Sequence, residues 1–172
     1  MEVSLERMER LQEMGRAENA TLYMVMLAAF NVILARYSGS DDVMVGSPIA
    51  GRRLKELENV VGMFVNTLAL RTDLSGDPTL RELVGRVREM VLGAYEHQDI
   101  PLDRIVAEVQ PERSLSHGTL FQVAFQLSDH VKTQATDTNA GVQVKEFGPG
   151  WGENNKVDLA LGLFVYADGL RG

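Results

Sequence analysis

The sequence predicts an α/β fold in which helices pack on a mixed β-sheet. Apolar residues recur every three or four positions in some segments, which is typical of helices, and every second position in others, which is typical of half-buried strands. These two kinds of segment are interleaved along the chain, and this favours a layered α/β sandwich. The 172 residues, of which 45% are hydrophobic and 24% charged, suffice for one domain with a substantial core.

Two helices are predicted near the N-terminus. Leucines and methionines about three positions apart indicate an amphipathic helix over residues 5 to 17, with Ser4 as its N-cap. The most apolar segment, residues 22 to 37, contains Asn31 and Arg36. It is also shorter than the ~20 apolar residues that a membrane span needs, so we expect a helix buried in protein.

Two strands are predicted next. Small and acidic residues at 38 to 42 favour a turn, VMVGSP at 43 to 48 favours a strand, and 50 to 60 form a polar loop in which a helical turn is an alternative. VGMFVNTLALR at 61 to 71 predicts a buried strand whose faces are both largely apolar, apart from Asn66. A buried amide without partners costs roughly 1 to 3 kcal/mol, so protein, water or a ligand must hydrogen-bond Asn66.

Two more helices follow a turn at 74 to 78. Thr79 and Glu82 have the spacing of a capping box, and this predicts a helix that begins there and ends near Tyr95. A second, short helix is predicted over residues 101 to 109, because a proline at the first helical position loses no hydrogen bond.

The last third predicts three strands. LFQVAFQL at 120 to 127 alternates between a drier face, which includes Phe121, and a wetter face. The polar residues 128 to 141 predict a mobile loop, and 142 to 147 and 156 to 167 predict two further strands.

The composition excludes several functional classes. Lys and Arg total 17 against 24 Asp and Glu, a net charge of −7, and no basic cluster is dense enough to bind nucleic acid. The absence of cysteine excludes disulfides and fits a reducing cytoplasm, and the charged N-terminus lacks a secretion signal, so we expect a cytoplasmic protein without a membrane anchor. The three histidines, His97, His117 and His130, lack the spacing of a zinc site, so no metal is expected.

The polar clusters do not form a complete catalytic set. Residues 128 to 130 read Ser-Asp-His, but neighbours in sequence cannot adopt the geometry of a hydrolase triad with one another. Residues 96 to 99 lie between two predicted helices, where capping of backbone groups is the expected role, and 113 to 118 predict a turn before a strand. The residues alone therefore predict a soluble α/β domain without its own catalytic machinery.

Three segments nevertheless resemble a known family. Residues 61 to 71, 96 to 106 and 111 to 127 resemble, in order and spacing, three core motifs of condensation domains from nonribosomal peptide synthetases. The flanking segments 21 to 52 and 157 to 172 are also similar to that family. The resemblance covers essentially the whole chain.

The resemblance implies one lobe of a two-lobed domain with a chloramphenicol-acetyltransferase-like fold. The family's catalytic motif, His-His-x-x-x-Asp-Gly, belongs to the first lobe, and this chain has no adjacent histidines. Residues 1–172 are therefore expected to be the C-terminal lobe, truncated at both ends, with the catalytic N-terminal lobe absent. The lobe alone is expected to be inactive.

The resemblance also implies a reaction and its partners. Condensation domains form an amide bond when the amine on a downstream peptidyl carrier protein attacks the thioester on an upstream one. The reaction takes place in a tunnel between the lobes, which a phosphopantetheine arm enters from each side. The implied partners are the N-terminal lobe, both carrier proteins and an adenylation domain, and no cofactor is expected to bind this chain directly.

Particular residues carry over by motif position. Asn66, Ser116 and Phe64 are implied to line the tunnel. Thr119 stands where a proline is usual and Leu102 replaces a common phenylalanine, while the overall pattern favours domains that join two L-configured residues. The motif residues with an implied structural role are Gly62, Thr67, Arg71, His97, Gln98, Asp99, Pro101, Arg113 and Phe121.

Two alternatives stay open. The chain is a module that docks carrier proteins without chemistry, or it is a lobe of a related acyltransferase that moves an acyl chain onto an alcohol, because the two-lobed fold is shared. The net charge of −7 argues against docking, since carrier proteins are usually acidic as well.

Overall fold

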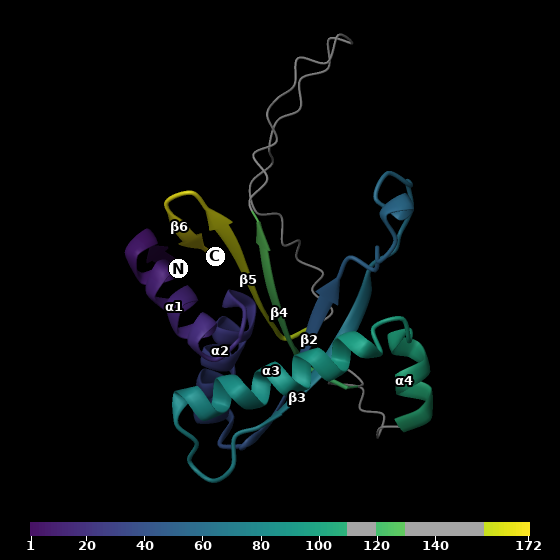
Figure 1. Ribbon diagram of the computed structural model, residues 1–172. Helices are drawn as coiled ribbons and strands as arrows, with labels where there is room; N and C mark the ends of the chain where they lie inside the picture. Colours follow the sequence, from purple (N-terminus) through teal and green to yellow (C-terminus); the bar gives the residue numbers. More distant parts are fainter. Residues whose placement is uncertain (110–119, 130–156) are drawn as a thin grey trace.

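A mixed sheet with helices packed on it forms the body of the protein (Figure 1). The computed structural model describes residues 1–109, 120–129 and 157–172. Within these ranges the sheet has six strands in the order β1-β6-β5-β4-β2-β3. The predicted α/β class is therefore confirmed, whereas the strand predicted at 142 to 147 lies outside the described residues.

The elements follow one another in the described part of the chain as helices interleaved with strands. Their bounds are β1 Glu2–Ser4, α1 Leu5–Ala17, α2 Leu22–Ser38, β2 Asp42–Ile49, η1 Lys55–Leu57, β3 Asn66–Asp73, α3 Leu80–Glu96, α4 Leu102–Val109, β4 Val123–Asp129, β5 Leu159–Tyr166 and β6 Gly169–Arg171.

The first two helices match their predicted ranges, but only the second has an N-cap side chain that forms a capping hydrogen bond. Ser4 occupies the N-cap of α1 as expected, yet its side chain makes no capping hydrogen bond. Thr21 caps α2 by accepting a hydrogen bond from the Met24 N–H at 3.3 Å, and Gly39 ends the helix in the left-handed conformation, with φ of 71°. Among the described residues no single helix is long and apolar enough to cross a membrane, and α1 and α2 pass that test only as a pair bent by 100°.

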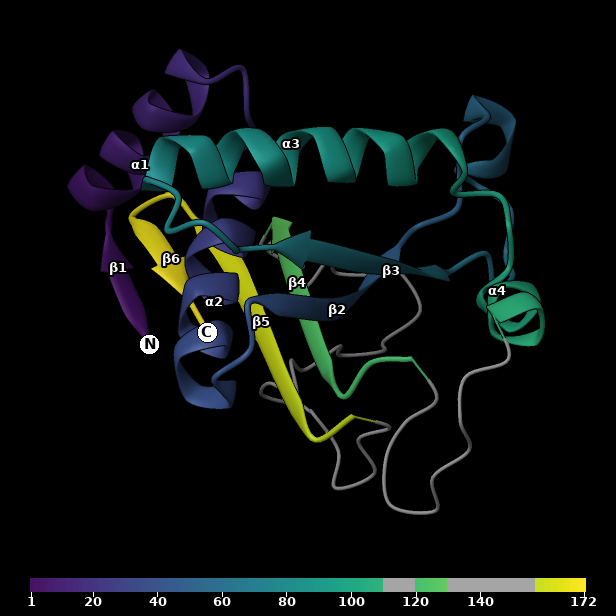
Figure 2. The ribbon, with the colours of Figure 1, turned by 90° about the horizontal axis from the view of Figure 1, so that it is seen from below.

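The predicted capping box opens α3. The Thr79 hydroxyl accepts from the Glu82 N–H at 3.3 Å, and the Glu82 carboxylate accepts from the Thr79 N–H at 2.8 Å. One apolar stripe of α3 is buried, and Figure 2 shows the helix running beside β3. The buried members of this stripe are Leu83, Val84, Val87 and Val91.

The core lies between the helices and one face of the sheet. Phe125 of β4 is fully buried, and its ring centroid lies 5.4 Å from that of Tyr23 and 5.7 Å from that of Phe30, both on α2. Neighbouring strands add further buried side chains on the same face: Val45, Leu70 and Leu163. A second, polar link joins helix to sheet where buried Asn31 of α2 donates to the Thr72 hydroxyl at 2.9 Å.

Three strands begin later than predicted, and one of them is β5, which begins at Leu159 instead of residue 156. β3 begins at Asn66 instead of residue 61, so the first five residues of the predicted strand belong to the connection that precedes it. β4 begins at Val123 instead of residue 120 and continues through Ser128 and Asp129, which were predicted to be loop.

The late start of β4 changes the position of Phe121. Val45 and Ser47 face the helices, so Gly46 between them faces the opposite side of the sheet. The Phe121 ring occupies the space that a Cβ on Gly46 would fill. Phe121 therefore does not share the face of Phe125, because its backbone precedes the strand and is free of the strand's alternation.

Two short strands were not predicted. β1 pairs antiparallel with β6, so that Glu2 faces Arg171 across the sheet, and β6 pairs with β5. The first and last residues of the chain also bond each other, since the Gly172 N–H donates to the Met1 carbonyl at 3.1 Å.

Candidate functional site

Asn66 ties the start of β3 to the connection between α3 and α4. Its Nδ2 donates to the carbonyl oxygens of Gln98 at 2.9 Å and Ile100 at 2.8 Å. Its Oδ1 accepts from the Leu102 N–H at 3.4 Å. The protein backbone therefore supplies the partners that the amide requires, and both of the donor's hydrogens are engaged.

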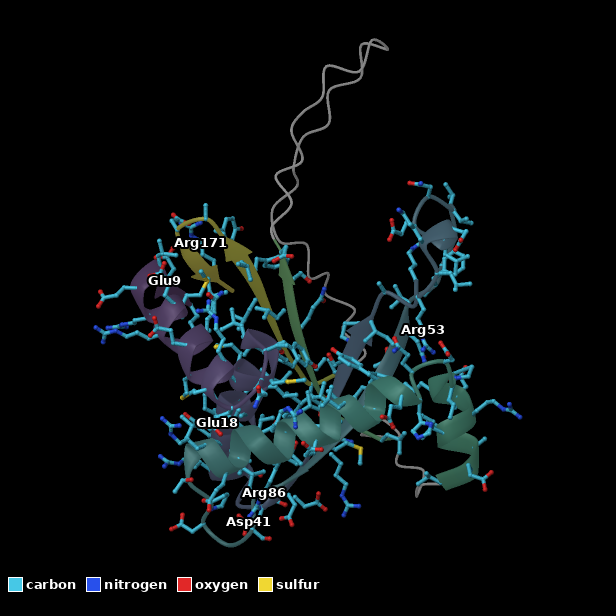
Figure 3. The ribbon with its side chains drawn as sticks, viewed as in Figure 1. Glu9, Glu18, Asp41, Arg53, Arg86 and Arg171 are labelled. Carbon is cyan, nitrogen blue, oxygen red and sulfur yellow. The ribbon has the colours of Figure 1, made fainter. Side chains whose placement is uncertain are left out.

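A second contact joins the α3–α4 connection to the segment between β2 and β3. Arg53, which Figure 3 labels, lies in the connection between β2 and β3. It forms an ion pair with Asp99. Beside it the Gln98 Nε2 donates to the Tyr95 carbonyl at 2.7 Å, and the His97 N–H donates to the Ala94 carbonyl at 3.2 Å. The Gln98 side chain therefore satisfies a carbonyl at the end of α3, which is the role that the sequence favoured. The His97 contact comes from its backbone, and the Asp99 side chain binds Arg53 instead.

A cavity of about 400 Å³ lies next to this junction. It opens at the carboxyl ends of β2 and β4, which run parallel, the edge at which open α/β sheets characteristically bind ligands. Ile49, which pairs with Asn66 across the β2–β3 ladder, belongs to its wall. The described lining residues are Tyr23, Ser47, Pro48, Ile49, Ala50, Val65, Tyr95, Gln126, Leu127 and Ser128.

Hydroxyl groups form a short hydrogen-bonded chain in the cavity wall. The Tyr23 O–H donates to Ser47 Oγ at 2.7 Å, and Ser47 in turn donates to the Phe125 carbonyl at 3.0 Å. Burial raises the pKa of Tyr23 to about 12, against the opposing effect of its hydrogen bond to Ser47. Burial also raises the pKa of Tyr95. Both phenols therefore stay protonated at neutral pH.

The described lining is uncharged. It consists of hydroxyl, amide and apolar groups, and none of these residues is Asp, Glu, His, Lys or Arg. Such a wall can orient a ligand by neutral hydrogen bonds and exclude water, but it holds no group that titrates near neutral pH. Within the described ranges there is also no group of three or more residues that could hold a metal ion.

The other predicted tunnel residues occupy different positions. Phe64 and Gly62 lie in the connection before β3, and Phe64 is half-buried. Ser116 lies outside the described residues, as does Arg113. The structure therefore brings Phe64 into the same connection as Arg53, close in sequence to Asn66, and leaves the placement of Ser116 as a prediction.

Two of the residues with a predicted structural role, Thr67 and Arg71, lie at different points along β3. Thr67 pairs with Pro48 near the cavity. Arg71 lies five positions from Asn66, about 17 Å along the strand. There its guanidinium donates three hydrogen bonds to the Asp42 carboxylate, at 2.7, 2.8 and 3.2 Å. Those bonds hold the pKa of the Asp42 carboxyl below its usual range.

Pro101 immediately precedes α4. The proline was predicted to open this helix, and it lies one residue before the first helical position. Its carbonyl accepts a hydrogen bond from the Arg104 N–H at 3.0 Å.

Sequence reasoning missed the polar wall of the cavity. Tyr23 and Ser47 each stand in an otherwise apolar segment, and their contact spans 24 positions. The sequence contains one indication of this wall. The hydroxyl of Ser47 lies on the strand face that also carries Val45 and Ile49. A polar side chain on a buried strand face needs a partner, as Asn66 does.

Comparisons with known proteins agree with this architecture. A family model described as Condensation domain matches residues 1–169. One component of the linear gramicidin synthase of Brevibacillus parabrevis is 50% identical over 147 residues, which are 86% of this chain and 3% of that protein. Another component of the same synthase is 45% identical over 166 residues, 96% of this chain and 3% of that protein. The chain thus spans only a few per cent of the length of these curated relatives.

Solved structures show the same fold. The X-domain from teicoplanin biosynthesis has a TM-score of 0.76 and 28% identity, and the match covers 94% of this chain and 37% of that one. Together with the family match over nearly all residues and the sequence motifs, this likeness shows that the chain belongs to the condensation domain family of nonribosomal peptide synthetases.

Proposed function

We propose that residues 1–172 act as the C-terminal lobe of a two-lobed condensation domain and form one wall of the tunnel in which an amide bond is made. The observation that carries the proposal is the cavity beside Asn66, whose described lining is uncharged, in a chain that matches the family over residues 1–169. The chain has no adjacent histidines, so the His-His-x-x-x-Asp-Gly motif must come from the N-terminal lobe.

In this reaction the amine on the downstream carrier attacks the carbonyl carbon of the upstream thioester. A C–N bond forms, the C–S bond breaks, and the amine's proton passes to a base and finally to the thiolate that leaves. The wall described here positions the two reactants and excludes water, effects that dominate when both partners are tethered. The base is assigned to the other lobe.

The partners follow from the same proposal. They are the N-terminal lobe, the upstream and downstream peptidyl carrier proteins, and an adenylation domain in one cytoplasmic synthetase. The phosphopantetheine arm of each carrier supplies the thiol that holds the acyl or aminoacyl group. The Tyr23 oxygen, which can still accept a hydrogen bond, and the amide of Gln126 suit the neutral amide and hydroxyl groups of such an arm, while Ser47 orients the Tyr23 hydroxyl.

The test compares amide formation from two loaded carrier proteins by the complete synthetase and by the 172-residue chain alone. The proposal expects product only from the complete synthetase, and turnover by the chain alone would overturn it. NMR titration of the chain with a carrier protein tests the docking alternative, because tight binding by this lobe alone favours docking over a tunnel wall.

A further inference from the structure

The connection between β2 and β3, residues 50 to 65, extends beyond the ends of both strands, and we call it the arm (Figures 1 and 2). None of its residues is buried. Val61 and Met63, in particular, are 101% and 93% exposed. Packing against the core therefore does not determine the conformation of the arm, and another interaction must.

Two side chains make such interactions: Arg53 ties the arm to Asp99, and Arg52 binds backbone carbonyls of the arm itself. Arg52 is therefore the one that acts within the arm. Its Nη1 donates to the carbonyls of Leu57 and Val60, the latter at 2.9 Å, and its Nη2 donates to the Gly62 carbonyl at 3.2 Å. The three acceptors lie at the end of η1 and in the chain that returns to the sheet. Only arginine offers this planar set of donors, since lysine presents a single point charge.

The same guanidinium also fixes Phe64. Its central carbon lies 4.4 Å from the centroid of the Phe64 ring. A Cβ on Gly62 would lie 3.1 Å from that ring, and a Cβ on Gly51, whose φ is 63°, would overlap the Phe64 carbonyl oxygen. Arg52 and the two glycines thus converge on one aromatic residue.

We propose that Arg52 is a positioning residue that shapes the arm and, through it, places Phe64 for the condensation reaction. The clamp on the arm stands on the contacts alone, whereas its effect on catalysis rests on the proposed function. Lys55, an exposed residue on the same arm, provides a charge-matched control.

The first experiment measures amide hydrogen exchange in the 172-residue chain. Two backbone amides of the arm donate hydrogen bonds to carbonyls of the arm. The Leu57 N–H donates to the Leu54 carbonyl at 2.9 Å, and the Val60 N–H donates to the Leu57 carbonyl at 3.2 Å. In Arg52→Ala and Arg52→Lys we expect these amides to exchange about tenfold faster, with β2 and β3 unchanged, because the arm opens locally. Lys55→Ala should leave them as in the wild type. Unchanged exchange in Arg52→Ala, or equal acceleration in the control, would overturn the proposal.

The second experiment measures amide formation by the complete synthetase. Arg52→Ala and Arg52→Lys should both lower kcat, because the conservative change keeps the charge without the geometry, while Lys55→Ala keeps the wild-type rate. In a Phe64→Leu background the further loss from Arg52→Ala should be smaller than in the wild type, because both changes act on the same ring. Additive losses would show that Arg52 does not act through Phe64. Absence of product from the wild-type synthetase would refute the proposed function and leave the exchange result standing.

Discussion

Replacing Asn66 by aspartate tests the junction between β3 and α4 most directly. The change keeps the size of the side chain but puts an oxygen that only accepts where Nδ2 donates to the carbonyls of Gln98 and Ile100. Each lost hydrogen bond lowers the free energy of unfolding by roughly 0.5 to 1.5 kcal/mol, so the two together lower it by about 1 to 3 kcal/mol. Repulsion between the carboxylate and the carbonyls adds to this loss, and Asn66→Ala should therefore be the milder variant.

The assay is urea unfolding of the 172-residue chain, combined with amide exchange in α4. Asn66→Asp should lower the free energy of unfolding and speed exchange over Leu102–Val109, the helix whose first N–H faces Asn66 Oδ1. Asn59→Asp makes the same chemical change at an exposed position of the arm and should shift stability by less than about 0.5 kcal/mol. If Asn66→Asp is as stable as this control and its α4 exchange is unchanged, the junction does not depend on the amide.

Activity adds a separate result. In the complete synthetase, Asn66→Ala should lower the rate of condensation, because α4 and the connection before it are no longer held to the start of β3. Wild-type activity together with intact folding would leave Asn66 without a role in the proposed reaction.

Four further changes test the fold and the cavity. Thr79→Ala should lower the free energy of unfolding by about 1 kcal/mol in a urea titration, and Thr79→Ser should restore it. Hydrogen bonds from Thr79 hold the pKa of Glu82 below its usual range, so stability should fall as the pH drops through that lowered pKa, and less so in Glu82→Gln. Gly46→Ala should cost roughly 1 to 3 kcal/mol through collision with the Phe121 ring, and Phe121→Leu should recover part of it. Because burial raises the pKa of Tyr23 from 10.0 to about 12, the free energy of unfolding should decrease across that pH interval, less steeply in Tyr23→Phe.

The helices and the central strands were predictable because their signals are local. The Thr79–Glu82 capping box and the stripe at three- and four-residue spacing behind it are contained within one stretch of chain, and α3 begins and ends within one residue of the prediction. The alternation in β4 likewise identified a strand, although its first residue was misplaced by three.

The arm shows where the same reasoning fails. Residues 61 to 65 are as apolar as a buried strand, yet Val61 and Met63 are almost fully exposed. Periodicity reports which residues favour burial but not whether the described chain supplies a partner for them. An apolar run outside the sheet is the pattern expected of a surface that another part of the protein covers.

The short strands and the cavity depend on contacts that no local pattern encodes. β1 has three residues and exists through pairing with β6 at the other end of the chain. The cavity wall likewise joins α2, β2, α3 and β4, and its chain of hydroxyls crosses from Tyr23 to Ser47 and then to the Phe125 backbone. Such sites become visible only when the fold places distant segments side by side.

The described lining of the cavity is neutral, and under the proposed function this limits what these residues contribute to the reaction. Removal of the amine's proton needs a group that titrates near neutral pH, and burial instead raises the pKa of Tyr23 to about 12. The lining can still orient tethered reactants, an effect worth up to about 7 to 11 kcal/mol when alignment is ideal. The proposed function therefore assigns positioning to the described lining and proton transfer to the other lobe. Tyr23→Phe should therefore change kcat and leave its pH profile in place, and a shifted profile would show that this wall takes part in the proton transfer itself.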